Sequence, residues 1–235
     1  MDTGNRSVSR SVLTYEKGSF FPHPRDLAQE TCWQLTVDGE GAETFSCSPW
    51  DLEETALGIL FFNGRISRAG EVSRLIIRPE QGLMEAELTP LPPSPREKAV
   101  PLALQASQIL SLAAGLEAGS GLFRRTGGVH SAALARNEKL LIRREDVSRH
   151  GVLEKVAGAC LREAVPMGGT VLVFSGRVSG EIVRMAALMG CGAIIARSAP
   201  TDLACRAAAE DGIILIGFAR DESFNLYTCP DQVVP

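Results

Sequence analysis

Three short runs in the second half of the chain combine an arginine with a neighbouring hydroxyl or glycine. They are Ser175-Gly-Arg177, Arg197-Ser-Ala-Pro-Thr201 and Phe218-Ala-Arg-Asp-Glu-Ser223. Each follows a short apolar run typical of a buried parallel strand. All three are therefore expected at the carboxyl ends of neighbouring parallel strands, where such sheets bind ligands. Helix N-termini at Ser179 and Thr201, together with the guanidinium groups, would favour a nucleotide phosphate. The alternative is that these hydroxyls only cap helices and the arginines form a solvated rim.

Residues near two predicted element boundaries form a second group of candidates. His130 follows a glycine pair at the start of a predicted strand, where the backbone can approach another group closely. Asp146, Arg149 and His150 lie at the entrance to a predicted helix, where Asp146 would favour the helix dipole and His150 could move a proton. A half-buried histidine and a helix-capping acid are the ordinary alternatives. A hydrolase that uses His130 and Asp146 is a further possibility, but the sequence offers no nucleophile to complete its catalytic site.

The cysteines are spread thinly over a long chain, unlike the dense sets that staple small secreted domains. They occupy positions 32, 47, 160, 191, 205 and 229. No two are spaced as Cys-x-x-Cys, so we expect reduced thiols and no zinc or other metal site. Zinc deaminases use a comparable sheet with His-x-Glu and Pro-Cys-x-x-Cys, whereas here Ser131-Ala132 follows His130 and no Pro-Cys occurs.

The elements that would position these residues fall into two parts. Residues 1–90 are predicted to form a small α+β unit, and the proline-rich run 91–101 a loop or linker, because proline removes backbone donors. The predicted elements of the first part are a hairpin over 31–47, a helix from Ser48 as N-cap and Pro49 to Asn63-Gly64, and strands over 72–77 and 83–88.

Residues 102–235 are predicted to form an α/β domain. Near-continuous apolar strands alternate with amphipathic helices, a pattern that favours parallel strands covered on both faces and hence a three-layer sheet. The predicted elements are a helix over 102–116, a hairpin over 130–143 around Asn137, helices over 148–164, 179–189 and 201–210, and strands over 170–174, 193–196 and 213–217.

Composition narrows the class of protein. The chain has 235 residues, of which 45% are hydrophobic, and a net charge of −4, so it carries no overall positive field for nucleic acid. No run approaches the roughly 18 apolar residues of a membrane span, and we expect a cytoplasmic protein without a membrane partner. Pairing of two copies through an edge of the appended hairpin unit is a further expectation.

Several motifs resemble one known family along most of the chain. Ser48-Pro-Trp-Asp-Leu-Glu53 is similar to the Ser-Pro-x-Asp-Leu-Glu helix of the FdhD family, the sulfur-carrier accessory proteins of molybdenum-dependent formate dehydrogenases. Glu145-Asp-Val-Ser-Arg-His150 resembles its Glu-Asp-Val-Gly-Arg-His. The later runs Ser198-Ala-Pro-Thr201, Leu215-Ile-Gly-Phe218 and Phe224-Asn-Leu-Tyr-Thr228 follow in the family's order.

The resemblance implies a cytidine-deaminase-like fold without zinc. It also implies transfer of sulfur from a cysteine desulfurase to bis-molybdopterin guanine dinucleotide, the molybdenum cofactor, before that cofactor enters formate dehydrogenase. The family's guanine-dinucleotide loop maps onto Phe218, Ala219, Arg220, Asp221, Glu222 and Ser223, where the two acids should weaken phosphate binding. The other expected cofactor-binding residues are Ser175, Arg177, Thr201, His130, Asp146 and Arg149.

The chain departs from the family at the persulfide site. Residues 91–99 stand where relatives carry Cys-x-x-Cys, whose thiolate accepts and releases sulfur. Cys191 is the one remaining thiol that coincides with a cysteine of relatives, and a buried core role is its ordinary alternative. The competing interpretation is therefore a non-catalytic module or chaperone that binds a guanine nucleotide or pterin cofactor on the same fold.

Overall fold

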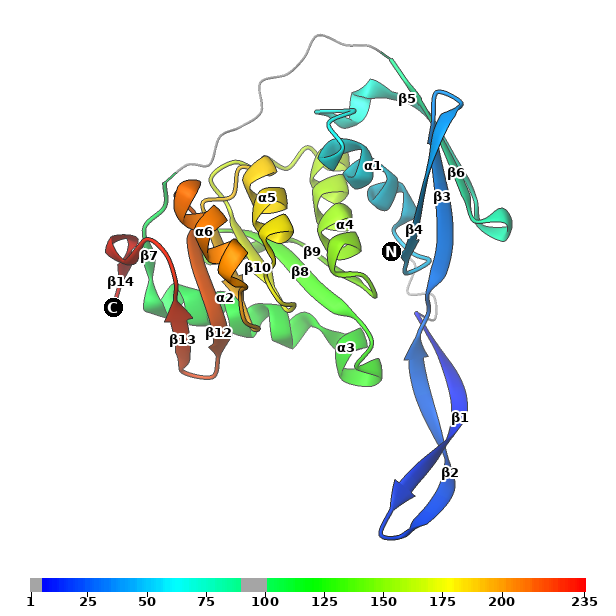
Figure 1. Ribbon diagram of the computed structural model, residues 1–235, viewed down its shortest axis with the longest axis horizontal. Helices are drawn as coiled ribbons and strands as arrows, with labels where there is room; N and C mark the ends of the chain where they lie inside the picture. Colours follow the sequence, from blue (N-terminus) through cyan, green and yellow to red (C-terminus); the bar gives the residue numbers. More distant parts are fainter. Residues whose placement is uncertain (1–5, 90–100) are drawn as a thin grey trace.

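The computed structural model describes residues 6–89 and 101–235, and its larger part is built on a six-stranded sheet (Figure 1). The strand order is β13-β12-β11-β10-β8-β9. The three central strands, β10 (Val171–Phe174), β11 (Ala193–Ala196) and β12 (Ile214–Arg220), are parallel, as their apolar runs predicted. Hairpins close both margins: β8 (His130–Arg136) with β9 (Lys139–Asp146), and β12 with β13 (Ser223–Leu226).

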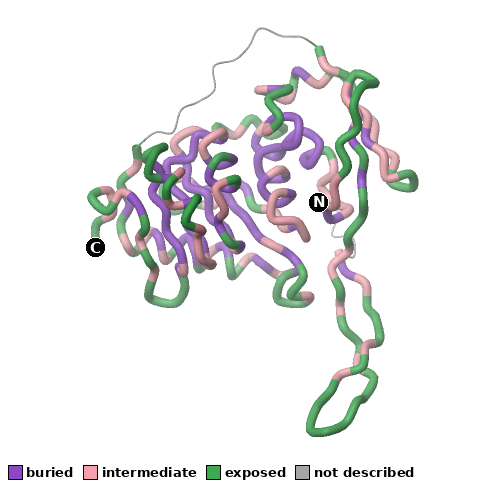
Figure 2. The backbone as a smooth tube through the Cα atoms, viewed as in Figure 1, coloured by how far each residue is buried: buried purple, intermediate pink, exposed green. Residues whose placement is uncertain are grey.

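Helices cover both faces of this sheet, which gives the three layers expected from the sequence. One face packs against α4 (Arg149–Arg162), α5 (Gly180–Leu188) and α6 (Asp202–Glu210), the other against α2 (Ala106–Gly119), which the short α3 (Gly121–Thr126) follows (Figure 1). Alternate strand residues separate into the two cores: Leu172 and Ile194 face α4 and α5, whereas Val173 and Ile195 face α2. The buried residues in Figure 2 accordingly follow the central strands.

A four-stranded sheet forms the first half of the chain, in the order β4-β3-β6-β5. Its strands are β3 (Thr31–Val37), β4 (Glu40–Cys47), β5 (Val72–Arg78) and β6 (Leu83–Leu88), and α1 (Leu52–Phe62) packs on it. The remaining short elements are η1 (Ala69–Glu71), η2 (Pro79–Gln81), η3 (Pro230–Gln232) and the paired β7 (Leu104–Gln105) and β14 (Val233–Val234). One hydrophobic cluster runs from Trp33 and Met84 through α1 into α4.

The contact between α1 and α4 depends on two glycines. A Cβ atom on Gly58 would lie 2.0 Å from the backbone oxygen of Glu154, and one on Gly158 would lie 1.9 Å from that of Glu54. The two helix backbones therefore touch directly, and no larger residue fits at either position without moving a helix.

The first strands were not predicted. Residues 7–28 form a two-stranded ribbon of β1 (Ser7–Glu16) and β2 (Ser19–Ala28) that projects away from both sheets and is mostly exposed (Figures 1 and 2). We call this ribbon the arm. The sequence here has no strict alternation of polar and apolar residues, because only the base of the arm contacts the body, where β2 meets α3, and most of both faces stays exposed.

Two helix starts differ from the sequence predictions. Ser48 does not cap α1; Asp51 precedes the helix with a φ of 54°, and the Ser48 hydroxyl accepts a hydrogen bond from Val147 N instead. The helix predicted from residue 102 begins at Ala106, since residues 104–105 pair with the C-terminal strand. Residues 91–100 of the predicted linker lie outside the described residues. Within the described ranges, no helix is long and apolar enough to cross a membrane.

Candidate functional site

The strand register brings most of the predicted loops together at one edge of the six-stranded sheet. Ala132 pairs with Phe174, and Phe174 pairs with Ala196, so His130, Ser175 and Arg197 follow one another across neighbouring strands. Ile195 pairs with Ile216, which places Phe218 next along the same edge. We call this edge, formed by the start of β8 and the ends of β10, β11 and β12, the loop edge. The parallel arrangement predicted from the sequence thus positions loops that are distant in the chain.

His130 is half-buried in the loop edge. Its ring lies 6.2 Å from that of Phe174, and a Cβ atom on Gly176 would lie 3.1 Å from its Nδ1 and 2.6 Å from Phe174 Cζ. Glycine at 176 therefore lets the backbone of this loop pass over both rings. Burial, reinforced by the positive charge of Arg149 and opposed by Asp146, lowers the pKa of His130. The imidazole is consequently neutral at pH 7 and offers one donor and one acceptor.

The hydroxyl groups of the loop edge are already engaged. Ser175 Oγ accepts from Ser131 N at 2.9 Å, and Ser175 N donates to Ser131 O at 2.9 Å, which fixes the start of this loop on β8. Thr201 Oγ1 accepts from Ala204 N at 3.2 Å and Ser179 Oγ from Ile182 N at 3.5 Å. Both residues therefore serve as helix N-caps, which was the alternative role considered for them.

The arginines of the loop edge differ in how they are paired. Arg197 forms an ion pair with Glu117 of α2. Arg149, at the first position of α4, and Arg177, which is exposed, have no acidic partner among the residues that the structure describes. Because α4, α5 and α6 all begin at this edge, their N-terminal amides add partial positive charge beside the two guanidinium groups. This arrangement suits an anionic ligand.

Residues 218–223 are a hairpin rather than the open loop predicted after residue 217. Strand β12 continues to Arg220 through a bulge, and Arg220 pairs with Ser223, which leaves Asp221 and Glu222 exposed at the tip. Phe218 has a φ of 55°, and the Arg220 guanidinium lies 5.9 Å from the centre of its ring. Ala219 is fully buried in the core beneath α2 and so faces away from any ligand at the tip.

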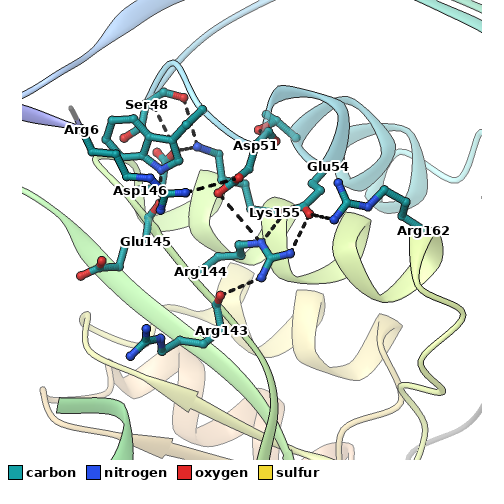
Figure 3. A network of polar contacts seen from close by, with 12 residues as sticks. Arg6, Ser48, Asp51, Glu54, Arg143, Arg144, Glu145, Asp146, Lys155 and Arg162 are labelled. Carbon is teal, nitrogen blue, oxygen red and sulfur yellow. Dashed lines mark hydrogen bonds and ion pairs between the residues drawn. The ribbon is translucent and has the colours of Figure 1, made fainter. Parts of the chain in front are cut away.

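Asp146 pairs with His130 in the β8–β9 hairpin, but its carboxylate is turned inward (Figure 3). It is fully buried and lies 2.6 Å from Nζ of Lys155, which is also fully buried. It accepts further hydrogen bonds from Ser48 N at 3.0 Å and Ser148 N at 2.7 Å, while Lys155 donates to Ser48 O at 3.0 Å. The Asp146–Lys155 pair therefore connects the backbone at Ser48, between β4 and α1, to the start of α4. This contact explains why Ser48 does not cap α1.

A second ion cluster joins the same two parts of the chain. Glu54, 1% exposed on α1, receives two hydrogen bonds from Arg144, with Nε–Oε2 at 2.5 Å and Nη2–Oε1 at 2.6 Å, and Arg162 lies 2.6 Å from its Oε1 (Figure 3). Neither Glu54 nor Lys155 was singled out from the sequence. The available signal was a charged residue within an apolar helical stretch, since such a residue must find a buried partner.

The sequence left Cys191 as a weak candidate for sulfur chemistry, and the structure places it away from the loop edge. Cys191 is fully buried with Sγ 3.5 Å from Thr170 Oγ1, and it precedes β11, at the opposite end of that strand from the loop edge. Burial raises the pKa of Cys47, Cys160 and Cys191 to about 12. A thiol of that pKa carries almost no thiolate at neutral pH. Cys32 is exposed, and Cys205 and Cys229 are half-buried.

The loop edge therefore presents positive charge, amide donors and a neutral imidazole, an arrangement suited to an anionic ligand. Of the twelve predicted cofactor-binding residues, His130, Arg149, Ser175, Arg177, Thr201 and Phe218 lie at or beside it. No group of three His, Cys, Asp or Glu side chains within the described ranges could hold a metal ion.

Comparison with known proteins gives one consistent result. A model of the FdhD/NarQ family matches residues 88–234. The chain is 34% identical to the sulfur carrier protein FdhD of Bacillus licheniformis, over 97% of this chain and 98% of that protein. It is 32% identical to FdhD of Staphylococcus haemolyticus, over 95% and 96% respectively. A crystal structure from Desulfotalea psychrophila, described as a formate dehydrogenase accessory protein, superposes with a TM-score of 0.84 at 24% identity, over 97% of this chain and 99% of that one.

Proposed function

We propose, because this chain belongs to the FdhD/NarQ family, that it acts as an accessory protein of a formate dehydrogenase and binds that enzyme's molybdenum cofactor at the loop edge. The cofactor, bis-molybdopterin guanine dinucleotide, is the cargo in this proposal. The observation that carries the proposal is the pair Arg149 and Arg177, which have no acidic partner among the described residues and stand where three helices begin.

These residues fit the phosphate groups of such a ligand. Guanidinium groups bind phosphate oxygens through charge-assisted, often bidentate hydrogen bonds, and helix N-termini add amide donors. Glycine at position 176 allows the loop that carries Arg177 to lie close to the rings of His130 and Phe174, since any side chain there would collide with them. In this proposal His130 contacts the guanine or pterin part as a neutral hydrogen-bonding group, and the exposed acids of the 218–223 hairpin lie outside the phosphate site.

Titration with guanosine diphosphate, the nucleotide portion of the cargo, tests the site. Arg177→Gln should raise the dissociation constant at least tenfold, because a charge-assisted hydrogen bond contributes about 1.5–3 kcal/mol. Arg74→Gln is the matched control: this arginine is exposed on β5, in the other sheet, and its loss should leave nucleotide binding unchanged. Equal effects of the two substitutions, or none, would remove the loop edge as the nucleotide site.

Sulfur transfer is the second component of the proposal, and the relatives named sulfur carrier proteins support it. We propose that sulfur from a cysteine desulfurase reaches an exposed thiol of this chain, for which Cys32 is the accessible choice and Cys191 is not. The burial of Cys47, Cys160 and Cys191, with no Cys-x-x-Cys in the sequence, favours a second candidate function: a module that binds cofactor and dehydrogenase without carrying sulfur.

Intact-mass spectrometry after incubation with cysteine and a desulfurase separates these two functions. A reducible gain of one sulfur that disappears in Cys32→Ser and persists in Cys191→Ala would establish a carrier thiol. No gain, in a sample where FdhD of Bacillus licheniformis gains sulfur, would leave binding as the function. We also propose that the three-layer sheet is of the cytidine-deaminase type, which the fold class supports. A cytoplasmic location is proposed as well, and the family supports it.

A further inference from the structure

The four-stranded sheet has an open edge at β4. In the order β4-β3-β6-β5 this strand is terminal, and among the strands that the structure describes it pairs with β3 alone. Its residues from Glu40 to Thr44 are exposed (Figure 2). The free side of an edge strand presents backbone N–H and C=O groups to which another chain can add. The exposed part of β4 therefore has the chemistry of a docking edge.

The hydrogen bonds of β3 determine which backbone groups of β4 face outward. Gln34 N donates to the carbonyl oxygen just before β6 at 2.8 Å, so this residue directs its backbone groups toward β6. The direction alternates along a strand, so the next residue, Leu35, is directed toward β4, where it pairs with Glu43. By the same alternation, Ala42 and Thr44, on either side of Glu43, direct their N–H and C=O groups away from β3. These groups are the ones available to a further strand.

A cavity of about 390 Å³ opens beside this part of β4, between the β3–β4 hairpin and the end of α1. Its floor is apolar, since Leu35 and Leu60 are 2% and 1% exposed and Val37 is half-buried. The rest of its lining consists of Glu40, Gly41, Ala42, Glu43, Asn63 and Arg65. An apolar floor below a charged rim suits long side chains that combine an aliphatic stem with a charged end. We call this cavity and the adjoining edge of β4 the β4 site.

The rim of the β4 site is acidic. Glu43 Oε2 accepts a hydrogen bond from Asn63 Nδ2 at 2.6 Å, which holds this exposed carboxylate between β4 and the end of α1. Glu40 is exposed as well and has no basic partner among the described residues. Arg65, the basic residue of the lining, lies 3.9 Å from Asp38 and is thereby already paired with an acid. The charge of the rim therefore favours a cationic group in the cavity.

We propose that an extended basic segment of a partner protein adds to β4 and inserts a lysine or arginine side chain into the cavity. Main-chain hydrogen bonds to Ala42 and Thr44 hold the segment, as in other strand additions. The aliphatic stem of the inserted side chain packs on Leu35 and Leu60, and its charged end pairs with Glu43. A second copy of this chain is a poorer partner here, because two β4 strands side by side would bring their carboxylates together. The β4 site belongs to the first half of the chain and is separate from the loop edge.

Fluorescence anisotropy with a labelled peptide tests the β4 site. The probe is a short peptide of alternating threonine and lysine, which places all its lysines on one face of a strand. It should bind saturably, and the same peptide with glutamate for lysine should not. Glu43→Gln should raise the dissociation constant of the lysine peptide at least about fivefold, because it removes a charge-assisted hydrogen bond. Glu53→Gln, at the exposed start of α1 and outside the cavity, makes the same change of charge and should alter it less than about twofold.

Backbone substitutions separate strand addition from attraction between charges alone. Thr44→Pro removes an N–H that faces away from β3, so the β3–β4 pairing should persist while the peptide no longer binds; Thr44→Val keeps the N–H and should bind like the wild type. Circular dichroism confirms that all the variants fold. In the peptide, N-methylation of the threonines should abolish binding of an antiparallel segment, and N-methylation of the lysines that of a parallel one.

Three results would overturn the proposal. The first is the absence of saturable binding of the lysine peptide to the wild-type chain. The second is an equal effect of Glu43→Gln and Glu53→Gln, which would mean that the peptide responds to net charge and not to the cavity. The third is undiminished binding of both N-methylated peptides, which would show that no strand adds to β4.

Discussion

Replacement of Asp146 by alanine should destabilise the protein strongly, because this carboxylate is the centre of a buried network. The substitution removes the counter-ion 2.6 Å from Lys155 and leaves the amides of Ser48 and Ser148 without their acceptor. Loss of one partner of a buried ion pair costs about 3–5 kcal/mol. Since a domain is typically stable by about 5–15 kcal/mol, Asp146→Ala should remove about a fifth or more of the total free energy of unfolding.

Urea unfolding followed by tryptophan fluorescence measures this effect, since Trp50 lies beside the network with its ring centre 5.1 Å from Lys155 Nζ. With a slope of about 3 kcal/mol per molar, the midpoint should fall by about 1–1.7 M. Lys155→Met combined with Asp146→Ala should cost less than the sum of the two single changes, because it removes both buried charges.

Two outcomes would refute this reasoning. The first is a free energy of unfolding for Asp146→Ala within about 1 kcal/mol of the wild type, which would mean that the carboxylate is not held in the buried pair. The second is additivity of the two substitutions, which would show that Asp146 and Lys155 do not interact. If Asp146→Ala instead kept its stability and lost guanosine diphosphate binding, the residue would contact the ligand, as the sequence alone suggested.

Three further predictions concern packing, thiols and pH. Gly158→Ala should lower the free energy of unfolding in urea by about 3 kcal/mol or more, because its methyl group would enter the α1 backbone. Gly70→Ala, with no atom within 4 Å of the added Cβ, is the control and should not lower it. Equal stability of the two variants would contradict the direct backbone contact between α1 and α4. In native protein Cys32 should be alkylated first, the half-buried Cys205 and Cys229 next, and Cys47, Cys160 and Cys191 last; fast labelling of those three buried thiols would disprove their pKa of about 12. Because the pKa of His130 is lowered in the folded protein, the unfolded chain binds the proton more tightly. The contribution of His130 to stability is therefore full above the ordinary pKa of 6.5 and should decline as the pH falls through 6.5 toward the folded pKa. An NMR titration should give a pKa below 6.5 that rises in Arg149→Gln, and no rise would exclude the influence of Arg149.

Local patterns in the sequence were sufficient for most individual elements. The apolar runs predicted as strands over 170–174 and 193–196 form β10 and β11, and the predicted hairpin turns at Asn137, whose φ is 56°. Thr201 caps α6, which was the alternative role considered for it. These features depend on residues within a few positions of one another, where side-chain shape and hydrogen bonding restrict the backbone directly. The order of the parallel strands then places the loop edge, because such strands all end on the same side.

The sequence by itself thus determined most of the elements outside the arm and which loops share an edge, whereas the tertiary structure decided what each side chain at the site does. Ser48 and Asp146 meet across 98 residues; that contact replaces the helix cap predicted for Ser48 and turns the carboxylate of Asp146, a predicted cofactor-binding residue, into the buried network. Lys155 and Glu54 become buried partners, and the arm is left without cover, through packing between distant segments. Local propensity specifies no such partners, because burial and charge pairing are settled only when the remote surfaces come together.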